Sequence, residues 1–576
     1  MAVKSNKNVL TGNPFAKINV PLWFKIIFVF CGAYLSLVFN VQSTVFYVQA
    51  FKGNKSIAFA CICAVVLFVL AGLVFLMFKW KFLEKLLERL GEKPLWARIV
   101  LPVFAAICAG TYIAQFYGSL TASAKHLGET ENWWFHIFQA FGFTGGSGFT
   151  PPRWILSFIL FIPLTVFYIY MVMSFTEIIK SVLTTLSGNE RKFLIIASVV
   201  SVVYIVFLYN SSSVYYGGLD RIYSYDSLPD SSYLINPFYY WSYYQYPIEP
   251  NFSLPIIVFA NMLAPMLQLW GIIMRTVVQF LLLLVAIIML SRMISEDPMV
   301  RLCSMLIFVF SFPVVILAAI TERRVITLVF LIIAMYQSIH EKDRRDEDDN
   351  FWLSAASGAV ICNAYVALLS VKSKKTFIRD AFVCGCVFLF LAAFLGKISG
   401  LLDLQSQINN FENSGWIDGE LNTKTKLLHY LNLVCSSFFA PPSLANMEKN
   451  RWEMAVLDSG SFNYLHILGI AIIALAIAGF VLNYKNRFAQ TAFTAILASI
   501  FFVYVKALNI NENAVVLNTL FFAWAFVSLN IMAVDKLLKK PKAKKAVLAV
   551  MFCACYCVSI LAAYQLYSFG VVAYPS

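Results

Sequence analysis

Charged residues are scarce in this sequence. Only 13% of its 576 residues are charged, whereas 60% are hydrophobic, and the mean hydropathy is +0.75. A soluble globular protein carries about 25% charged residues, so this composition cannot cover a water-facing surface. The chain also lacks a polar stretch long enough for a soluble domain. We therefore predict an all-α, polytopic integral membrane protein that is embedded in the lipid bilayer.

The sequence also lacks a disulfide framework and a basic face suited to nucleic acid. Its net charge is +14, but Lys and Arg occur in short runs between apolar segments, which is typical of cytoplasmic loops. Most of the twelve cysteines lie within apolar segments, where cysteine behaves as a small apolar residue. We predict no nucleic-acid partner and no metal-ligating residues.

Apolar runs close to the ~20 residues that cross a bilayer as a helix recur along the chain. We predict about thirteen spans: 22–41, 57–78, 99–118, 154–175, 193–210, 275–292, 301–320, 325–340, 380–398, 464–484, 488–505, 514–533 and 546–568. Lysines gather around the start of the first span, which predicts a cytoplasmic N-terminus. The basic loops 79–98 and 536–545 then also lie inside, and the C-terminus lies outside a multi-pass protein of the cell membrane.

Two further apolar stretches do not fit this alternation as full spans. If 352–371 crossed the membrane, the basic residues just after it and every later loop would change sides. We expect a re-entrant or interfacial hairpin there, with a break near Gly358 and Asn363. The stretch 254–273 is interrupted by Pro255 and Pro265, so we expect it to follow the outer interface or to enter the membrane only partly.

The chain divides into two predicted regions. Residues 1–192 form a four-helix transmembrane region, and residues 193–576 form a module with sizeable outer loops at 211–253 and 399–463. Any chemistry must lie in the outer loops and in the cavity beneath them, because no soluble domain is available to carry it.

The loop 211–253 carries the main functional signal. It holds three aspartates, Asp220, Asp226 and Asp230, with Arg221, Trp241 and ten tyrosines. A positioned carboxylate can take the proton of a hydroxyl that attacks an anomeric carbon. Tyrosine and tryptophan rings have apolar faces and polar tips, which suit sugar rings. The alternative interpretation is a hydrated loop whose tyrosines form an interfacial belt.

A span, an outer loop with spaced aspartates, an interfacial helix and another span together resemble the start of a type C glycosyltransferase (GT-C) module. The resemblance covers about 193–400. It implies a sugar donor carried on a polyprenyl phosphate, a glycan or envelope-polymer acceptor, and a catalytic aspartate in the module's first outer loop. The chain departs from the family at its actual first outer loop, 43–56, which has no acidic residue. The module would therefore begin at the fifth predicted span.

The resemblance also implies roles for residues of the loop 211–253. Asp226 is the expected general base, and Asp220 is the second choice. The expected substrate-binding residues beside them are Arg221, Tyr225, Asp230 and Trp241.

Two basic groups elsewhere are candidates for contacting the donor phosphate. Arg323 and Arg324 lie in a predicted outer turn between two spans, and arginine binds phosphate through paired hydrogen bonds. Glu322 in the same turn either orients an arginine or serves in the site. Lys449 and Arg451, in the loop 399–463, form the second group. The alternative for the turn is an ordinary hairpin whose arginines reach the interface. His429 is interpreted as a residue on the polar face of an amphipathic helix.

The leading functional hypothesis is sugar transfer from a polyprenyl-phosphate-linked donor to a cell-envelope acceptor on the extracytoplasmic face. A transporter or lipid-linked saccharide flippase is an alternative, although the predicted spans contain few ionisable residues away from their ends. An envelope polysaccharide polymerase or ligase is a third hypothesis, in which outer arginines would matter more than Asp226. The need for a divalent metal stays open.

Overall fold

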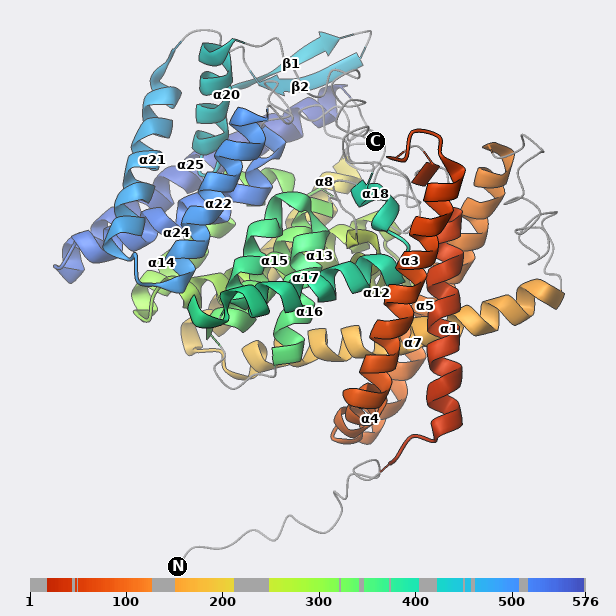
Figure 1. Cartoon of the computed structure of the whole chain (residues 1–576). Helices are drawn as coiled ribbons and strands as arrows, with labels where there is room; N and C mark the ends of the chain where they lie inside the picture. Colours follow the sequence, from red (N-terminus) through yellow and green to blue (C-terminus); the bar gives the residue numbers. More distant parts are fainter. Residues whose placement is uncertain are drawn as a thin grey trace, which may run out of the picture. The chain divides into compact units, whose positions relative to one another are not determined.

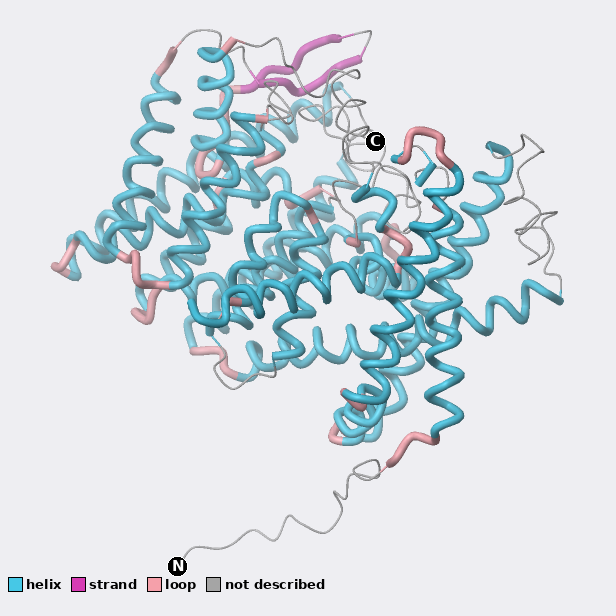
Figure 2. Tube along the Cα trace, viewed as in Figure 1, coloured by secondary structure: helices cyan, strands magenta, loops and turns pink. Residues whose placement is uncertain are grey.

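Helices form nearly all of the part of the chain that the structure describes (Figure 1; Figure 2). The structure is a computed structural model. It describes residues 18–43, 47–48, 50–126, 151–211, 248–320, 323–340, 346–371, 374–402, 422–448, 451–456, 462–506 and 516–573. The predicted helical class is confirmed. One short antiparallel hairpin, β1 (Ser443–Glu448) and β2 (Arg451–Val456), lies within the predicted loop 399–463.

Eleven of the described helices are long and apolar enough to cross a membrane. They are Leu22–Val41, Lys55–Lys79, Leu95–Gln115, Ile155–Thr184, Gly188–Ser211, Gly271–Ile294, Phe377–Phe394, Tyr464–Leu482, Arg487–Val505, Thr519–Leu537 and Pro541–Val572. A multi-pass, lipid-embedded protein is therefore confirmed. The predicted spans 301–320 and 325–340 fall on shorter apolar helices, so the total of thirteen and the side of each terminus stay predictions.

The chain packs into two compact units. Unit 1 contains the described residues up to Glu177 and those of Leu389–Asp403, and unit 2 contains the described remainder. The elements of unit 1 are α1 (Leu22–Gln42), α3 (Lys55–Val74), the π-helix η1 (Phe75–Lys79), α4 (Phe82–Gly91), α5 (Leu95–His126), most of α7 (Pro151–Thr184), the end of α17 (Phe377–Phe394) and α18 (Ile398–Leu402).

Unit 2 holds the remaining elements. They are α8 (Gly188–Ser211), α12 (Glu249–Met266), α13 (Gly271–Ile294), α14 (Pro298–Val309), the π-helix η3 (Pro313–Leu317), α15 (Arg323–His340), α16 (Asp346–Ala359), the 3-10 helices η4 (Ile361–Ser370) and η5 (Lys374–Thr376), the start of α17, α20 (Thr423–Ser436), β1, β2, α21 (Tyr464–Leu482), α22 (Arg487–Ser499), the π-helix η6 (Ile500–Val505), α24 (Thr519–Leu537) and α25 (Pro541–Ala573).

In unit 1, polar side chains of α1 hold the turn that ends α17. Ser36 Oγ and Asn40 Nδ2 both donate to the Ala393 carbonyl, each at 2.9 Å. Gly396 in this turn has φ of 70°, and a Cβ there would lie 2.5 Å from Phe39 Cβ. Glycine is needed here because the backbone is left-handed and α1 approaches it closely. The carbonyl that the helix end exposes is thus bonded within the protein, as a lipid environment requires.

α13 and α24 form the centre of unit 2, since 78% and 83% of their apolar windows are buried. α21 packs along α24. Asn530 of α24 donates from Nδ2 to the Ile472 carbonyl of α21 at 3.1 Å. Further along, Gly479 lies so close that an added Cβ would be 2.0 Å from the Leu529 carbonyl oxygen. Small residues let helix backbones approach in this way in membranes, where dispersion forces drive packing.

A buried ion pair joins α8 and α13 at one end of unit 2. Arg292 donates from Nε and Nη2 to the two carboxylate oxygens of Glu190, at 3.0 and 2.8 Å. Both residues are buried, and Arg292 Nη2 also donates to the Thr185 carbonyl at 3.0 Å. Directly after the end of α13, Ser295 Oγ donates a hydrogen bond to the Asp535 carboxylate of α24 at 3.0 Å. The start of α8, the end of α13 and the end of α24 therefore meet here.

The helix α14 is interrupted, and side chains of two other helices donate to carbonyls that the break exposes. Pro313, which has no N–H, begins η3 after the turn at Phe310. Ser559 of α25 donates to the Phe310 carbonyl at 2.6 Å. Tyr204 of α8 donates to the Val315 carbonyl at 3.1 Å. Non-helical backbone is tolerated at membrane depth only when such partners are present.

The stretch 352–371 is broken where the sequence predicted. α16 ends at Ala359, Val360 is extended, and η4 follows. α16 and η4 pack against each other, as in the expected hairpin. Arg487 at the start of α22 donates from Nη2 to the Leu369 and Val371 carbonyls, at 3.0 and 2.9 Å. Whether this hairpin is re-entrant, and from which face, stays a prediction.

The stretch 254–273 also departs from a full span. It begins in α12 and reaches the first turn of α13, with a turn at Leu267 and Gln268 between them. The first half of α12 is buried, whereas Met266 and Trp270 are 78% and 68% exposed. The break confirms that the stretch is not one continuous helix, and its place at the outer interface stays a prediction.

We predict that Gly479→Ala destabilises the protein by about 1–3 kcal/mol, because the new methyl group overlaps the Leu529 carbonyl and forces α21 away from α24. Gly385→Ala, in α17, is the matched control, since a Cβ there meets nothing within 4 Å. That change should be neutral or stabilising by up to ~1 kcal/mol. Thermal unfolding of the purified proteins in detergent measures both. Equal effects of the two substitutions would contradict the close contact.

We also predict that Arg292→Gln costs about 3–5 kcal/mol of stability, because it leaves the Glu190 carboxylate buried without its cation. Arg379→Gln is the control. Its ion pair with Asp380 has an arginine side chain that is 72% exposed, and such pairs contribute about 0–1 kcal/mol. Denaturant titration of both variants measures the difference. If Arg292→Gln lowered the free energy of unfolding by less than ~1 kcal/mol, the ion pair would not be what holds α8 and α13 together.

Candidate functional site

Most of the residues predicted to form the site lie outside the described part of the chain. These are Asp220, Arg221, Tyr225, Asp226, Asp230, Trp241, Glu322 and Lys449. Arg323 begins α15 and Arg451 begins β2, opposite Glu448, but their side chains are not described. The structure therefore bears on the predicted site through Arg324, whose side chain it does describe.

Arg324 lies at the start of α15 and is 7% exposed. Its guanidinium carbon lies 5.8 Å from the centre of the Phe521 ring, which belongs to the first turn of α24. An arginine over an aromatic face gains an attraction that grows when water is excluded. The Arg324 carbonyl accepts a hydrogen bond from Thr327 Oγ1 at 2.8 Å. The cation is thus directed into the protein, and is not a freely solvated charge on a surface turn.

The tip of the α16–η4 hairpin lies close to this arginine. The Cys362 thiol lies within electrostatic range of the Arg324 guanidinium. Asn363, the next residue of η4, is 1% exposed, and its side-chain amide has no hydrogen-bond partner among the described residues. The Tyr365 hydroxyl lies beside the Trp524 indole of α24. A cation, an amide and a phenol therefore gather around the starts of α15 and α24.

Gln279 of α13 holds the backbone that leads into Arg324. Its Nε2 donates to the Ile320 carbonyl at 2.5 Å and also reaches the Ala318 carbonyl at 3.4 Å. Gln279 is 2% exposed, so these bonds form away from water. Ile320 is the last described residue before α15, which begins at Arg323. Gln279 therefore holds the backbone four residues before Arg324.

Several of these residues were not predicted from the sequence as members of a site. Asn363 was proposed only as a helix break, and Gln279 is a single polar residue in an apolar span. His429 was interpreted as a polar-face residue. That interpretation is wrong, because His429 is 5% exposed and lies within electrostatic range of the buried His466. Such assignments depend on which helices pack together, which one-dimensional patterns do not contain.

The arrangement is suited to binding an anion beside an apolar phase. A buried guanidinium can pair with a phosphate through two parallel hydrogen bonds, and the adjacent amide can accept or donate. Among the described residues, no three His, Cys, Asp or Glu side chains gather in a way that could hold a metal ion. Comparisons of the chain with protein-family models, with curated proteins and with solved structures find no match.

We predict that Gln279→Met destabilises the protein by about 1–3 kcal/mol, because it removes the buried donor to the Ile320 carbonyl while keeping the side-chain volume. Gln490→Met is the matched control, since Gln490 also donates to a backbone carbonyl, that of Tyr484 at 2.8 Å, but in an exposed position. The control should change stability by less than ~0.5 kcal/mol. Thermal unfolding of both variants in detergent measures the difference. Equal losses of stability would show that the burial of the Gln279 hydrogen bond does not matter.

Proposed function

We propose that the protein is a membrane glycosyltransferase that moves a sugar from a polyprenyl-phosphate-linked donor to a cell-envelope acceptor on the extracytoplasmic face. The observation that supports it most is the buried Arg324 at the start of α15. Taking a cation out of water is costly, so a buried arginine at a helix end indicates a specific binding or structural role. A lipid-linked donor presents its phosphate where apolar protein meets water, and the predicted topology places this arginine in that setting.

In this proposal Arg324 binds the donor phosphate and holds it while the bond from the anomeric carbon to the phosphate oxygen breaks. The acceptor hydroxyl attacks the anomeric carbon, and Asp226 takes its proton. The phosphate leaves as an anion, and the guanidinium stabilises the negative charge that develops on it. The assignment of Asp226, with Asp220 as the second choice, comes from the GT-C resemblance, and the loop that holds both lies outside the described residues.

A polysaccharide polymerase or ligase is the second candidate. It would use the same class of lipid carrier, and the observation in its favour is again Arg324. An enzyme that depends on binding the diphosphate of a long lipid-linked saccharide needs a strong cation at the outer end of its helices. In that case the transferred unit is an oligosaccharide, and the arginine contributes more to turnover than the aspartates do.

The test is transfer of labelled sugar from polyprenyl-phosphate donors in membranes that contain matched amounts of each variant. Wild type should transfer, and Arg324→Gln should lose about 100-fold or more, the usual cost of removing a charge-stabilising donor. Arg324→Lys should recover part of this, because it restores the charge without the paired geometry. Arg379→Gln, an exposed arginine, should keep full activity.

The aspartate variants separate the two candidates. Loss in Asp226→Asn, or in Asp220→Asn alone, supports a general base in the loop 211–253 and identifies which residue it is. Full activity of both with loss in Arg324→Gln favours the polymerase or ligase. Full activity of a folded Arg324→Gln protein would contradict the proposal that this arginine binds the donor.

A further inference from the structure

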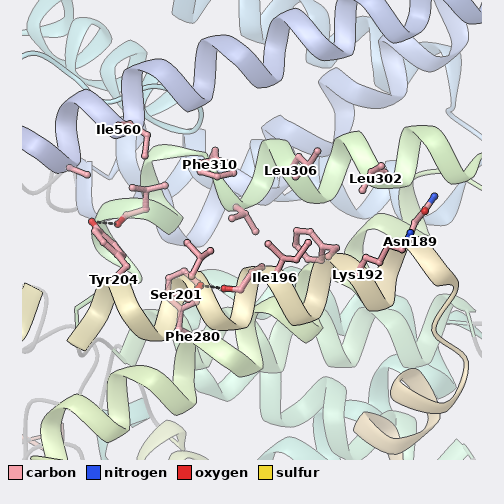
Figure 3. A pocket seen from close by; sticks show the side chains of 16 residues that line it. Asn189, Lys192, Ile196, Ser201, Tyr204, Phe280, Leu302, Leu306, Phe310 and Ile560 are labelled. Carbon is pink, nitrogen blue, oxygen red and sulfur yellow. Dashed lines mark hydrogen bonds between the residues drawn. The ribbon is translucent and has the colours of Figure 1, made fainter. Parts of the chain in front are cut away.

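A groove of about 370 Å³ runs along α8 in unit 2, and helices α14 and α25 form its other walls (Figure 3). It is lined by Asn189, Lys192, Phe193, Ile196, Ala197, Val200, Ser201, Tyr204, Phe280, Leu302, Leu306, Val309, Phe310, Val315, Ile560 and Ala563. From Asn189 to Tyr204 the groove follows α8 for about 22 Å, at the usual rise of ~1.5 Å per residue. Its shape is long and narrow, as a single hydrocarbon chain requires.

The walls of the groove offer no free polar group along most of its length. Ser201 Oγ donates to the Ala197 carbonyl at 2.6 Å. The Tyr204 hydroxyl donates to the Val315 carbonyl at 3.1 Å, so it is already used by the break after α14. Figure 3 shows both bonds. A cavity without available polar partners does not hold ordered water, so the favourable occupant is apolar.

The rim of the groove is exposed on α8. Ile196 and Val200 are 63% and 58% exposed, and Ile560 across the groove is 44% exposed. These residues lie on helices that are long and apolar enough to cross a membrane. The opening therefore faces the lipid phase, and a chain can enter from the side without passing through water.

Positive charge is concentrated at one end. Lys192 and Asn189 lie together at the end near Leu302, and Tyr204 and Ile560 lie at the other (Figure 3). Arg301, in the first turn of α14, approaches Glu190 of the same region to 3.9 Å. α25 runs in the same direction as α14, because Lys545 lies within electrostatic range of Cys303 in the first half of α14, and Phe310, just after α14, packs against Phe552 and Tyr556.

The parallel course of α14 and α25 brings further lysines to this end. α25 begins with Pro541-Lys542-Ala543-Lys544-Lys545. Lys544 pairs with Asp535 at 2.5 Å, and Glu190 is occupied by Arg292. Glu296 and Asp297 lie exposed just before α14 and add negative charge at this end. The basic residues Lys192, Arg292, Arg301, Lys542, Lys544 and Lys545 still outnumber the acidic residues Glu190, Glu296, Asp297 and Asp535, so this end of the groove carries net positive charge.

We propose that this groove binds an anionic phospholipid, with one acyl chain along α8 and the phosphate beside Lys192. A neutral lipid would use the apolar walls but not the charged end, and a soluble anion would use the charged end but not the walls. The charge pattern assigns this end to the cytoplasmic side, where anionic headgroups are abundant. The site is separate from Arg324, which lies at the start of α15, and it does not depend on the proposed function.

Two adjacent pairs of residues provide matched variants. Lys192 lines the groove and Arg191 does not, although both are exposed basic residues at the start of α8. Val200 lines the groove, whereas Val199, which is 60% exposed, does not. Lys192→Gln removes the charge and Arg191→Gln controls for it. Val200→Trp fills the groove, and Val199→Trp controls for a large residue facing lipid.

The experiment adds dioleoylphosphatidylglycerol or dioleoylphosphatidylcholine to the delipidated full chain in a nonionic detergent. Native mass spectrometry follows retained lipid, and thermal unfolding gives an independent readout. Wild type should retain the anionic dioleoylphosphatidylglycerol in preference to dioleoylphosphatidylcholine, and the anionic lipid should raise its unfolding temperature. Lys192→Gln should weaken this binding about fivefold, as expected for one lysine at a phosphate, and Arg191→Gln should not. Val200→Trp should abolish saturable binding of both lipids, and Val199→Trp should retain it.

Four results would overturn the proposal. Equal retention of the two lipids by wild type would remove the role of charge. Equal effects of Lys192→Gln and Arg191→Gln would indicate unspecific attraction. Equal stabilisation by inorganic phosphate and by dioleoylphosphatidylglycerol would show that the apolar walls contribute nothing. Displacement of dioleoylphosphatidylglycerol by polyprenyl phosphate at a concentration below that of the phospholipid would identify the carrier lipid, and not a phospholipid, as the occupant.

Discussion

The constraint on which this structure depends is that backbone polar groups at membrane depth must find partners inside the protein. Two of the breaks in helical structure within the described part of unit 2 lie before Pro313 and at Val360. At the first, the side chains of Ser559, Tyr204 and Gln279 donate hydrogen bonds to backbone carbonyls, and at the second the Ile248 N–H donates to the Gly358 carbonyl. These donors belong to α25, α8, α13 and the N-terminal end of α12, so satisfying the breaks also fixes how these helices pack.

These breaks position the candidate site. Gln279 holds Ile320 at the end of the first break, four residues before Arg324 in the sequence. The tip of the second break brings Cys362 and Asn363 to the same region. Continuous helices would have carried all of these groups past each other along the membrane normal. The interruption after α14 also shapes the lipid-facing groove, since Phe310 and Val315 line it.

The sequence was sufficient for the helical membrane class because its apolar runs have the length that a bilayer requires. It also located the break between Gly358 and Asn363, because charges on both sides of that stretch made a full span inconsistent with the other loops. It did not reveal that Arg324 packs against Phe521, almost 200 residues away, or that His429 is buried. Contacts of that range depend on helix packing, and a hairpin such as β1–β2 in a polar loop gives only a weak periodic signal. The domain boundary at 192 and the aspartates of the loop 211–253 stay predictions.

The central claim is that Arg324 lies where the protein binds the phosphate of a lipid carrier, and photocrosslinking tests it most directly. A polyprenyl phosphate with a photoreactive group next to the phosphate would be irradiated with the full chain in membranes, and the labelled peptides mapped. The account predicts labelling of peptides around 321–327, 360–365 and 516–524, reduced in Arg324→Gln and unchanged in Arg379→Gln. Labelling confined to other helices, at equal levels in wild type and Arg324→Gln, would contradict it.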